Sequence, residues 1–204
     1  MSTQWRHRVT APRFTSLFGV LIGAVGGGAY WLAAQIWPTS IAVILSMLAT
    51  TLLSAGSSPG AGRRVPAADS GLVGFVFAIF VKYNVLMALS AAKVPFALPA
   101  NFALVLIMIA GQACSHALLV SLPAAPKPAS VGDIGLALAI GFAPAALIGL
   151  PGLVGLAGAI LARLVFAAYL RRRGAPLTPA DLEGTQQLTE VCFYLSALAA
   201  WAYI

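Results

Sequence analysis

Long apolar runs separated by short polar segments dominate the chain, and they predict helices that cross a membrane. A spanning helix needs about 20 residues. The runs that approach this length lie at 15–36, 39–56, 71–91, 98–122, 132–149, 151–170 and 186–204. Only Leu150 and Pro151 separate the fifth run from the sixth, which predicts a tight helical hairpin and leaves six spans as the alternative to seven. The pattern predicts an all-α fold, a polytopic integral membrane helical bundle.

Composition extends this prediction to the whole chain. Of the 204 residues, 60% are apolar and 8% are charged, whereas a soluble domain is about 25% charged. We therefore expect one transmembrane domain over 15–204, preceded by a basic cytoplasmic segment over 1–14. The net charge is +7, but the basic residues are dispersed among the loops. This dispersal favours contact with membrane lipid and excludes nucleic-acid binding.

The basic residues also predict how the chain is oriented in the membrane. Cytoplasmic loops carry an excess of Lys and Arg. If the N-terminus is inside, the outer segments hold only Lys93. The inner segments then hold Arg6, Arg8, Arg13, Arg63, Arg64, Lys127, Arg171, Arg172 and Arg173. We expect a cytoplasmic N-terminus in a bacterial inner (cytoplasmic) membrane.

Small residues predict where helices approach one another. Gly19, Gly23 and Gly27 recur every four residues, and the sixth run carries Gly152, Gly155 and Gly158. Glycine faces let helix backbones come close in lipid, where no hydrophobic force drives association. The first face would also suit a helix of a second copy, so a homo-oligomer is one expectation. Cys114 and Cys192 lie inside apolar runs without a CxxC pattern, which predicts neither a disulfide nor a zinc site.

Polar residues inside the spans are the candidates for function, because an ionisable side chain there costs about 2.5–3.5 kcal/mol to insert. They are Lys82, Gln112, Ser115, His116, Arg163, Gln186, Gln187, Thr189 and Glu190. In the predicted orientation, the groups of the fourth and seventh spans meet Asp69 and Ser70 at one cytoplasmic mouth. The alternative is mutual satisfaction, with Glu190 pairing with His116 or Arg163, and Lys82 pairing with a carbonyl group or Glu190. Asp133 is expected to cap the fifth span.

The segment TPADLEGTQQLTEVCFYL, residues 178–195, resembles the C-terminal signature of cobalamin synthase, the adenosylcobinamide-GDP ribazoletransferase family. That signature reads approximately T-G-D-x-L-G-A-x-Q-Q-L-T-E. The matching residues are Thr178, Leu182, Gln186, Gln187, Leu188, Thr189 and Glu190. Residues 18–56 are similar to the early helices of the family, and Asp69-Ser70 followed by Lys82 resembles its D-S-R … K region. The resemblance covers most of the chain.

The resemblance implies a reaction in late cobalamin biosynthesis, in which adenosylcobinamide-GDP and α-ribazole are joined and GMP is released. Such phosphoryl transfer uses Mg²⁺ held by carboxylates. The resemblance implies Asp69, Asp181 and Glu190 as metal ligands and Lys82, His116 and Glu190 as catalytic residues. The residues implied for substrate binding are Asp69, Ser70, Arg63, Arg64, Gln186, Gln187 and Thr178.

The chain departs from the family pattern at the catalytic equipment. An H-x-D-G-x-x-D-x-x-D-G-like metal loop follows the early helices of the family, but this chain has SSPGAGRRVP there, without a carboxylate. The T-G-D has become Thr178-Pro179-Ala180. These departures predict a degenerate, catalytically impaired homologue and leave open whether it is an enzyme. The alternatives are a non-catalytic scaffold or corrinoid-intermediate binder, acting with corrinoid-pathway enzymes, and a small membrane carrier.

Overall fold

A computed structural model describes residues 12–57, 69–92, 100–122, 130–174 and 177–203. Within these residues the chain forms seven α-helices and no strand, which confirms the predicted all-α fold. The helices are α1 (Pro12–Ala33), α2 (Thr39–Ser57), α3 (Asp69–Ala91), α4 (Ala100–Val120), α5 (Val131–Leu147), α6 (Leu150–Arg173) and α7 (Pro179–Trp201).

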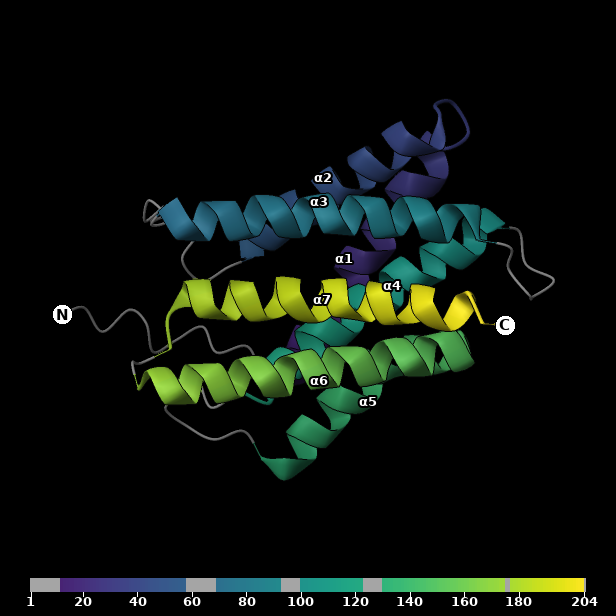
Figure 1. Cartoon of the computed structure of the whole chain (residues 1–204). Coiled ribbons are helices and arrows are strands. Elements are labelled where there is room, and N and C mark those ends of the chain that lie inside the picture. The colour runs from purple at the N-terminus through teal and green to yellow at the C-terminus, as the bar shows by residue number, and fades with distance from the viewer. Residues whose placement is uncertain (1–11, 58–68, 93–99, 123–129, 175–176, 204) are drawn as a thin grey trace.

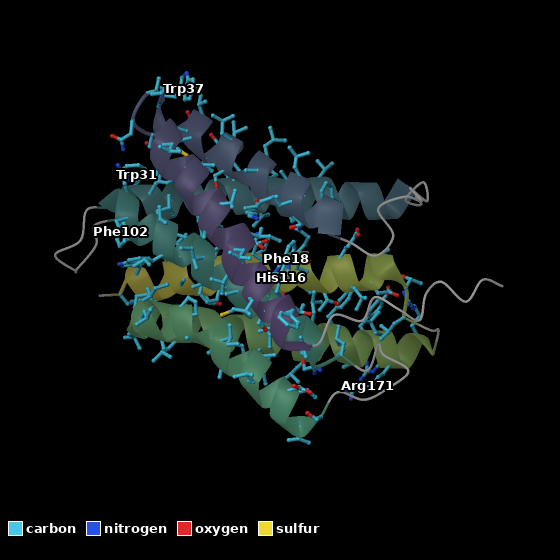
Figure 2. All side chains as sticks on the ribbon, turned by 180° about the vertical axis from the view of Figure 1, so that it is seen from behind. Phe18, Trp31, Trp37, Phe102, His116 and Arg171 are labelled. Atoms are coloured by element: carbon cyan, nitrogen blue, oxygen red, sulfur yellow. The ribbon has the colours of Figure 1, made fainter. Side chains whose placement is uncertain are left out.

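Helix α4 lies at the centre of the bundle. In Figure 1, α3, α7 and α6 lie side by side as one layer, and α4 crosses behind α7 at an angle. Helix α1 packs on the other side of α4, as the view from behind in Figure 2 shows. Contacts from both sides shield α4 from the surroundings. Of its apolar stretch 72% is buried, more than in the other three candidate spans.

Among the described residues, four helices are long and apolar enough to cross a membrane: Phe14–Ala33, Gly74–Ala91, Asn101–Val120 and Leu150–Arg173. Only 22% of the apolar stretch of α3 and 28% of that of α6 is buried. Phe77 in α3 and Leu161 in α6 leave more than half of their surface exposed. Exposed apolar faces of this extent are unfavourable in water and favourable in lipid. The fold is therefore a helical membrane bundle, as the sequence predicts.

The glycine faces pack inside the chain. A Cβ atom added to Gly23 would lie 2.7 Å from the Cα of Ile109 in α4, and Gly19 and Gly27 approach the same helix equally closely. Gly155 and Gly158 face Phe193 and Ser196 in α7. The predicted close approach of helices is confirmed, and α4 of the same chain occupies the face of α1 that would have suited a second copy.

The predicted starts agree with the structure to within three residues for six helices, and the start of α7 differs by seven. Helix α7 begins at Pro179, seven residues before the predicted span, because Thr178 and Asp181 form a reciprocal capping box ahead of the apolar run. The cap of α5 is Ser130 and not Asp133, whose backbone N–H donates to the Ser130 hydroxyl. In both helices the cap is a hydroxyl side chain that lies ahead of the apolar run, where hydropathy gives no signal.

Candidate functional site

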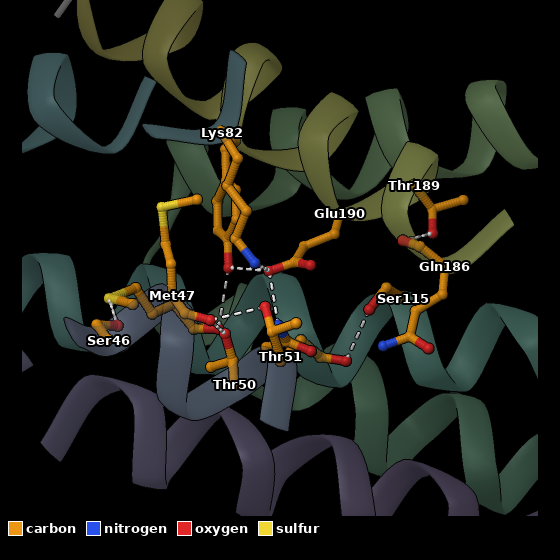
Figure 3. Close-up of polar contacts among 12 residues, drawn as sticks. Ser46, Met47, Thr50, Thr51, Lys82, Ser115, Gln186, Thr189 and Glu190 are labelled. Carbon is orange, nitrogen blue, oxygen red and sulfur yellow. Dashed lines mark hydrogen bonds and ion pairs between the residues drawn. The ribbon is translucent and has the colours of Figure 1, made fainter. Parts of the chain in front are cut away.

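The most strongly buried polar cluster lies where α3, α4 and α7 meet. Its centre is Glu190, which is fully buried, and Figure 3 shows Lys82 reaching it from the neighbouring helix. The Lys82 Nζ lies 2.6 Å from Glu190 Oε1, and Lys82 is itself 5% exposed. Of the pairings that the sequence left open, the structure therefore selects Lys82 with Glu190.

One oxygen of Glu190 receives every donor of the cluster. Besides Lys82, the side-chain amide of Gln112 donates to Oε1 at 2.7 Å, and the hydroxyl of Tyr194 donates at 2.9 Å. Glu190 Oε2 and Gln112 Oε1 are buried and have no hydrogen-bond partner in the described part of the chain. The carboxylate is neutralised and held by three helices, because α3, α4 and α7 each supply at least one of these groups.

Tyr194 is the member of the cluster that the sequence reasoning missed. Its hydroxyl also reaches the Met108 carbonyl at 3.3 Å, and its ring lies 5.9 Å below the Lys82 ammonium. The ring packs directly on Gly111, where an added Cβ would lie 2.6 Å from Tyr194 Cζ. The spacing of Glu190 and Tyr194 by four residues places both on one face of α7 and was the available signal.

His116 lies one turn of α4 beyond Gln112. Its Nδ1 lies 2.9 Å from the Gln112 carbonyl oxygen, which only accepts, so Nδ1 carries the hydrogen. Nε2 of the neutral ring then accepts from the Gln186 amide at 3.4 Å. Phe18 of α1 meets the ring edge-on, with centroids 6.3 Å apart. His116 and Gln186 therefore extend the Glu190 cluster towards the start of α7. The cluster brings together four of the predicted site residues: Lys82, His116, Gln186 and Glu190.

A second polar group surrounds Asp181 in the first turn of α7. Arg173 at the end of α6 donates to both carboxylate oxygens, at 2.8 and 2.6 Å. The backbone N–H and the hydroxyl of Thr178 each donate to Oδ2 at 2.8 Å. The hydrogen bonds from Arg173 lower the pKa of the Asp181 carboxyl to about 2, with those from Thr178 acting in the same direction. Thr178 and Asp181 thus close the start of α7.

Among the remaining predicted residues, the structure describes the side chains of Gln187 and Arg163, and neither belongs to these two groups. Arg63 and Arg64 and the side chains of Asp69 and Ser70 lie outside the described residues. Gln187 is half-buried on α7. Arg163 donates to the backbone carbonyl of Ser121 at 2.6 Å and does not pair with Glu190. The predicted convergence is therefore observed for α4 and α7, with Lys82 added from α3.

The described residues do not fit a Mg²⁺ ion. Such an ion takes one or two carboxylates as well as substrate phosphates. Lys82 pairs with Glu190, and Arg173 pairs with Asp181. The two carboxylates are nine residues apart on α7, which corresponds to about 13 Å of helical rise. No group of three or more His, Cys, Asp or Glu side chains that could hold a metal occurs in the part of the chain that the structure describes. A magnesium site that includes Asp69 stays a prediction.

Comparison with known proteins gives three curated relatives of the same description. An adenosylcobinamide-GDP ribazoletransferase of Leptothrix cholodnii is 33% identical over 233 residues, covering 96% of this chain and 86% of the relative. Those of Ralstonia nicotianae and Shewanella frigidimarina are 29% and 26% identical, covering 94% and 93% of this chain and 84% of each relative. No family model and no solved structure matches the chain.

The lengths of these matches add one observation. The aligned stretches span 233, 226 and 225 residues, and each is longer than this chain of 204 residues. The relatives therefore contain residues that have no counterpart here.

Proposed function

This chain belongs to the adenosylcobinamide-GDP ribazoletransferase family, and from that premise we propose that it binds the corrinoid substrate in late cobalamin biosynthesis but is impaired in ribazole transfer. Transfer would join adenosylcobinamide-GDP to α-ribazole. The proposal separates two properties, binding and turnover, which the active relatives combine.

The state of Glu190 carries this proposal. Metal-assisted phosphoryl transfer requires carboxylates that are free to hold the ion. Here Glu190 Oε1 is taken by Lys82, Gln112 and Tyr194, and only Oε2 remains without a partner. If a metal displaced Lys82 from Glu190, the buried ammonium of Lys82 would lose its counter-charge, and an unpaired buried charge typically costs about 3–5 kcal/mol. A metal would have to overcome that cost to recruit Glu190.

The missing segment supports the same conclusion. The resemblance implies a metal loop where this chain has SSPGAGRRVP, and the relatives contain residues that this chain lacks. Loss of that loop would remove the principal carboxylates, while the chain keeps the helices that carry the Glu190 cluster. Residual transfer would require Mg²⁺ held by Asp69 and substrate phosphates, with further ligands from another chain such as a corrinoid-pathway enzyme.

The site is proposed to face the cytoplasm from a bacterial inner membrane. The polar residues of α7 from Thr178 to Tyr194 fill its N-terminal part, beside the basic end of α6 at Arg171–Arg173. Beyond Tyr194 the buried residues of α7 are apolar: Ala197 and Trp201. A carrier needs polar groups along a path to both sides, so this distribution counts against the carrier alternative.

The decisive experiment compares this chain with the Leptothrix relative in membranes of a strain that lacks its own ribazoletransferase. We expect this chain to retain adenosylcobinamide-GDP, measured by corrinoid absorbance, and to form no product from α-ribazole at saturating Mg²⁺. Turnover within about tenfold of the relative would contradict the impairment. Absence of both binding and turnover would contradict the proposed function.

A further inference from the structure

Arg163 occupies an unusual position in α6. It lies ten residues before the last residue of the helix, inside an apolar stretch that is long enough to cross the membrane. Its Nη2 donates to the Ser121 carbonyl just beyond the end of α4, at 2.6 Å. Its Nε is buried and has no acceptor among the residues that the structure describes. The side chain is thus anchored at one nitrogen and unsatisfied at another.

The positive charge of Arg163 has no anionic partner among the described residues. The ion pairs within 4 Å in this part of the chain are Lys82–Glu190 and Arg173–Asp181. The nearby charge that acts on Arg163 is Arg171, which is also positive. Capping of α4 by Arg163 accounts for one hydrogen bond, but a neutral donor would serve that purpose without the cost of a charge in an apolar span.

The surroundings of Arg163 favour a phosphate group as the missing anion. Guanidinium groups bind phosphate oxygens through two parallel N–H donors. Arg171 follows eight residues later, about 12 Å along the helix and about 80° around it, and its side chain is exposed. In Figure 2 it lies at the end of the molecule opposite to Trp31 and Trp37. Leu164, seven residues before Arg171 and therefore on the same side of α6 as Arg171, is exposed and offers an apolar surface.

We propose that Arg163 and Arg171 form a phosphate-binding site on α6, next to the end of α4. The phosphate is supplied either by the headgroup of an anionic lipid, whose acyl chains then cover the exposed Leu164, or by a phosphorylated solute. Basic pockets between transmembrane helices bind lipid headgroups in this way. The site is separate from the Glu190 cluster and does not depend on whether the chain transfers ribazole.

The test uses the full chain reconstituted in nanodiscs of phosphatidylcholine with and without phosphatidylglycerol. Native mass spectrometry counts the phosphatidylglycerol molecules that remain bound. Arg171→Ala and Arg163→Ala should each weaken retention about fivefold, the factor that corresponds to about 1 kcal/mol per basic residue. Arg172→Ala is the matched control, because it removes the same charge at the same end of α6, about two and a half turns from Arg163 and on the opposite side.

Two further arms complete the design. Inorganic diphosphate added to discs of pure phosphatidylcholine tests the soluble source. If diphosphate binds and Arg171→Ala weakens that binding, the site takes a solute. If diphosphate does not bind and phosphatidylglycerol is retained, the site takes a lipid headgroup. If Arg163→Ala does not fold, the comparison of Arg171→Ala with Arg172→Ala decides whether the proposed site exists. Equal behaviour of those two variants towards both probes, or equal retention of the two lipids by the unaltered chain, would overturn the proposal.

Discussion

Helix α7 carries two ion pairs with the same closest distance, 2.6 Å, in two different environments. In the Lys82–Glu190 pair the side chains are 6% and 0% exposed, whereas in the Arg173–Asp181 pair they are 33% and 10% exposed. Water can solvate Arg173 when its partner is removed, but it cannot reach Glu190. The two pairs have the same distance, but because one is buried and the other is partly exposed, breaking them should change the stability by different amounts.

The two pairs also differ in what surrounds the carboxylate. Asp181 accepts hydrogen bonds from Thr178 and Arg173, which are three and eight residues before it in the sequence. These hydrogen bonds organise the start of one helix. Glu190 is held by groups from α3 and α4 that are distant in sequence. The first arrangement is local and caps α7, whereas the second joins three helices. Substitutions around each carboxylate can test this contrast.

The largest effect is expected for Lys82→Met. It leaves Glu190 as a buried unpaired charge, which should lower the free energy of unfolding by about 3–5 kcal/mol. Unfolding of the reconstituted chain by denaturant, followed by circular dichroism, measures this. The double variant Lys82→Met with Glu190→Leu removes both charges and should recover most of the loss. A double variant as unstable as Lys82→Met alone would show that the ion pair is not the cause.

Tyr194→Phe should have a smaller effect. It removes one hydrogen bond to the Glu190 carboxylate but keeps the ring that packs on Gly111, so we expect a loss of about 1.5–3 kcal/mol. The measurement is the melting temperature of each variant reconstituted in nanodiscs. Tyr203→Phe is the matched control, because Tyr203 is 92% exposed. Equal melting temperatures of the two variants would mean that the Tyr194 hydroxyl does not support the cluster.

Thr178→Ala tests the local arrangement. It removes the side-chain half of the capping box and should destabilise the start of α7 by about 1 kcal/mol. Amide hydrogen exchange over the first turns of α7 is the measurement, with Thr178→Ser as the control that keeps a hydroxyl acceptor. Faster exchange that extends to Glu190 would contradict the separation of the two regions.

Arg173→Ala should have the smallest effect on stability and a clear effect on titration. The pKa of Asp181 is lowered from 3.8 to about 2, chiefly by its hydrogen bonds with Arg173. A lowered pKa contributes stability that is complete above about pH 3.8 and is lost as the pH falls towards 2. Without Arg173 the titration of Asp181, followed by carboxyl NMR, should move upwards towards 3.8. Arg172→Ala is the matched control and should leave it unchanged.

Hydropathy was sufficient to predict the helices and their order, because each apolar run must satisfy its backbone within itself in lipid. The spacing of Gly19, Gly23 and Gly27 also predicted a close-packed face. Helix starts were less accurate, because capping by Thr178 and Ser130 depends on polar residues outside the apolar runs. The resemblance of residues 178–195 likewise identified the family to which the chain belongs.

The tertiary structure alone decided which polar groups meet. Lys82 had several potential partners, and only the packing of α3 against α7 placed it 2.6 Å from Glu190 and left Arg163 with the Ser121 carbonyl. The sequence determined that charged side chains are buried in an apolar chain. Which of them neutralise one another depends on the rotation and depth of each helix in the bundle. Those are set by contacts such as Gly111 with Tyr194, between residues far apart in the sequence.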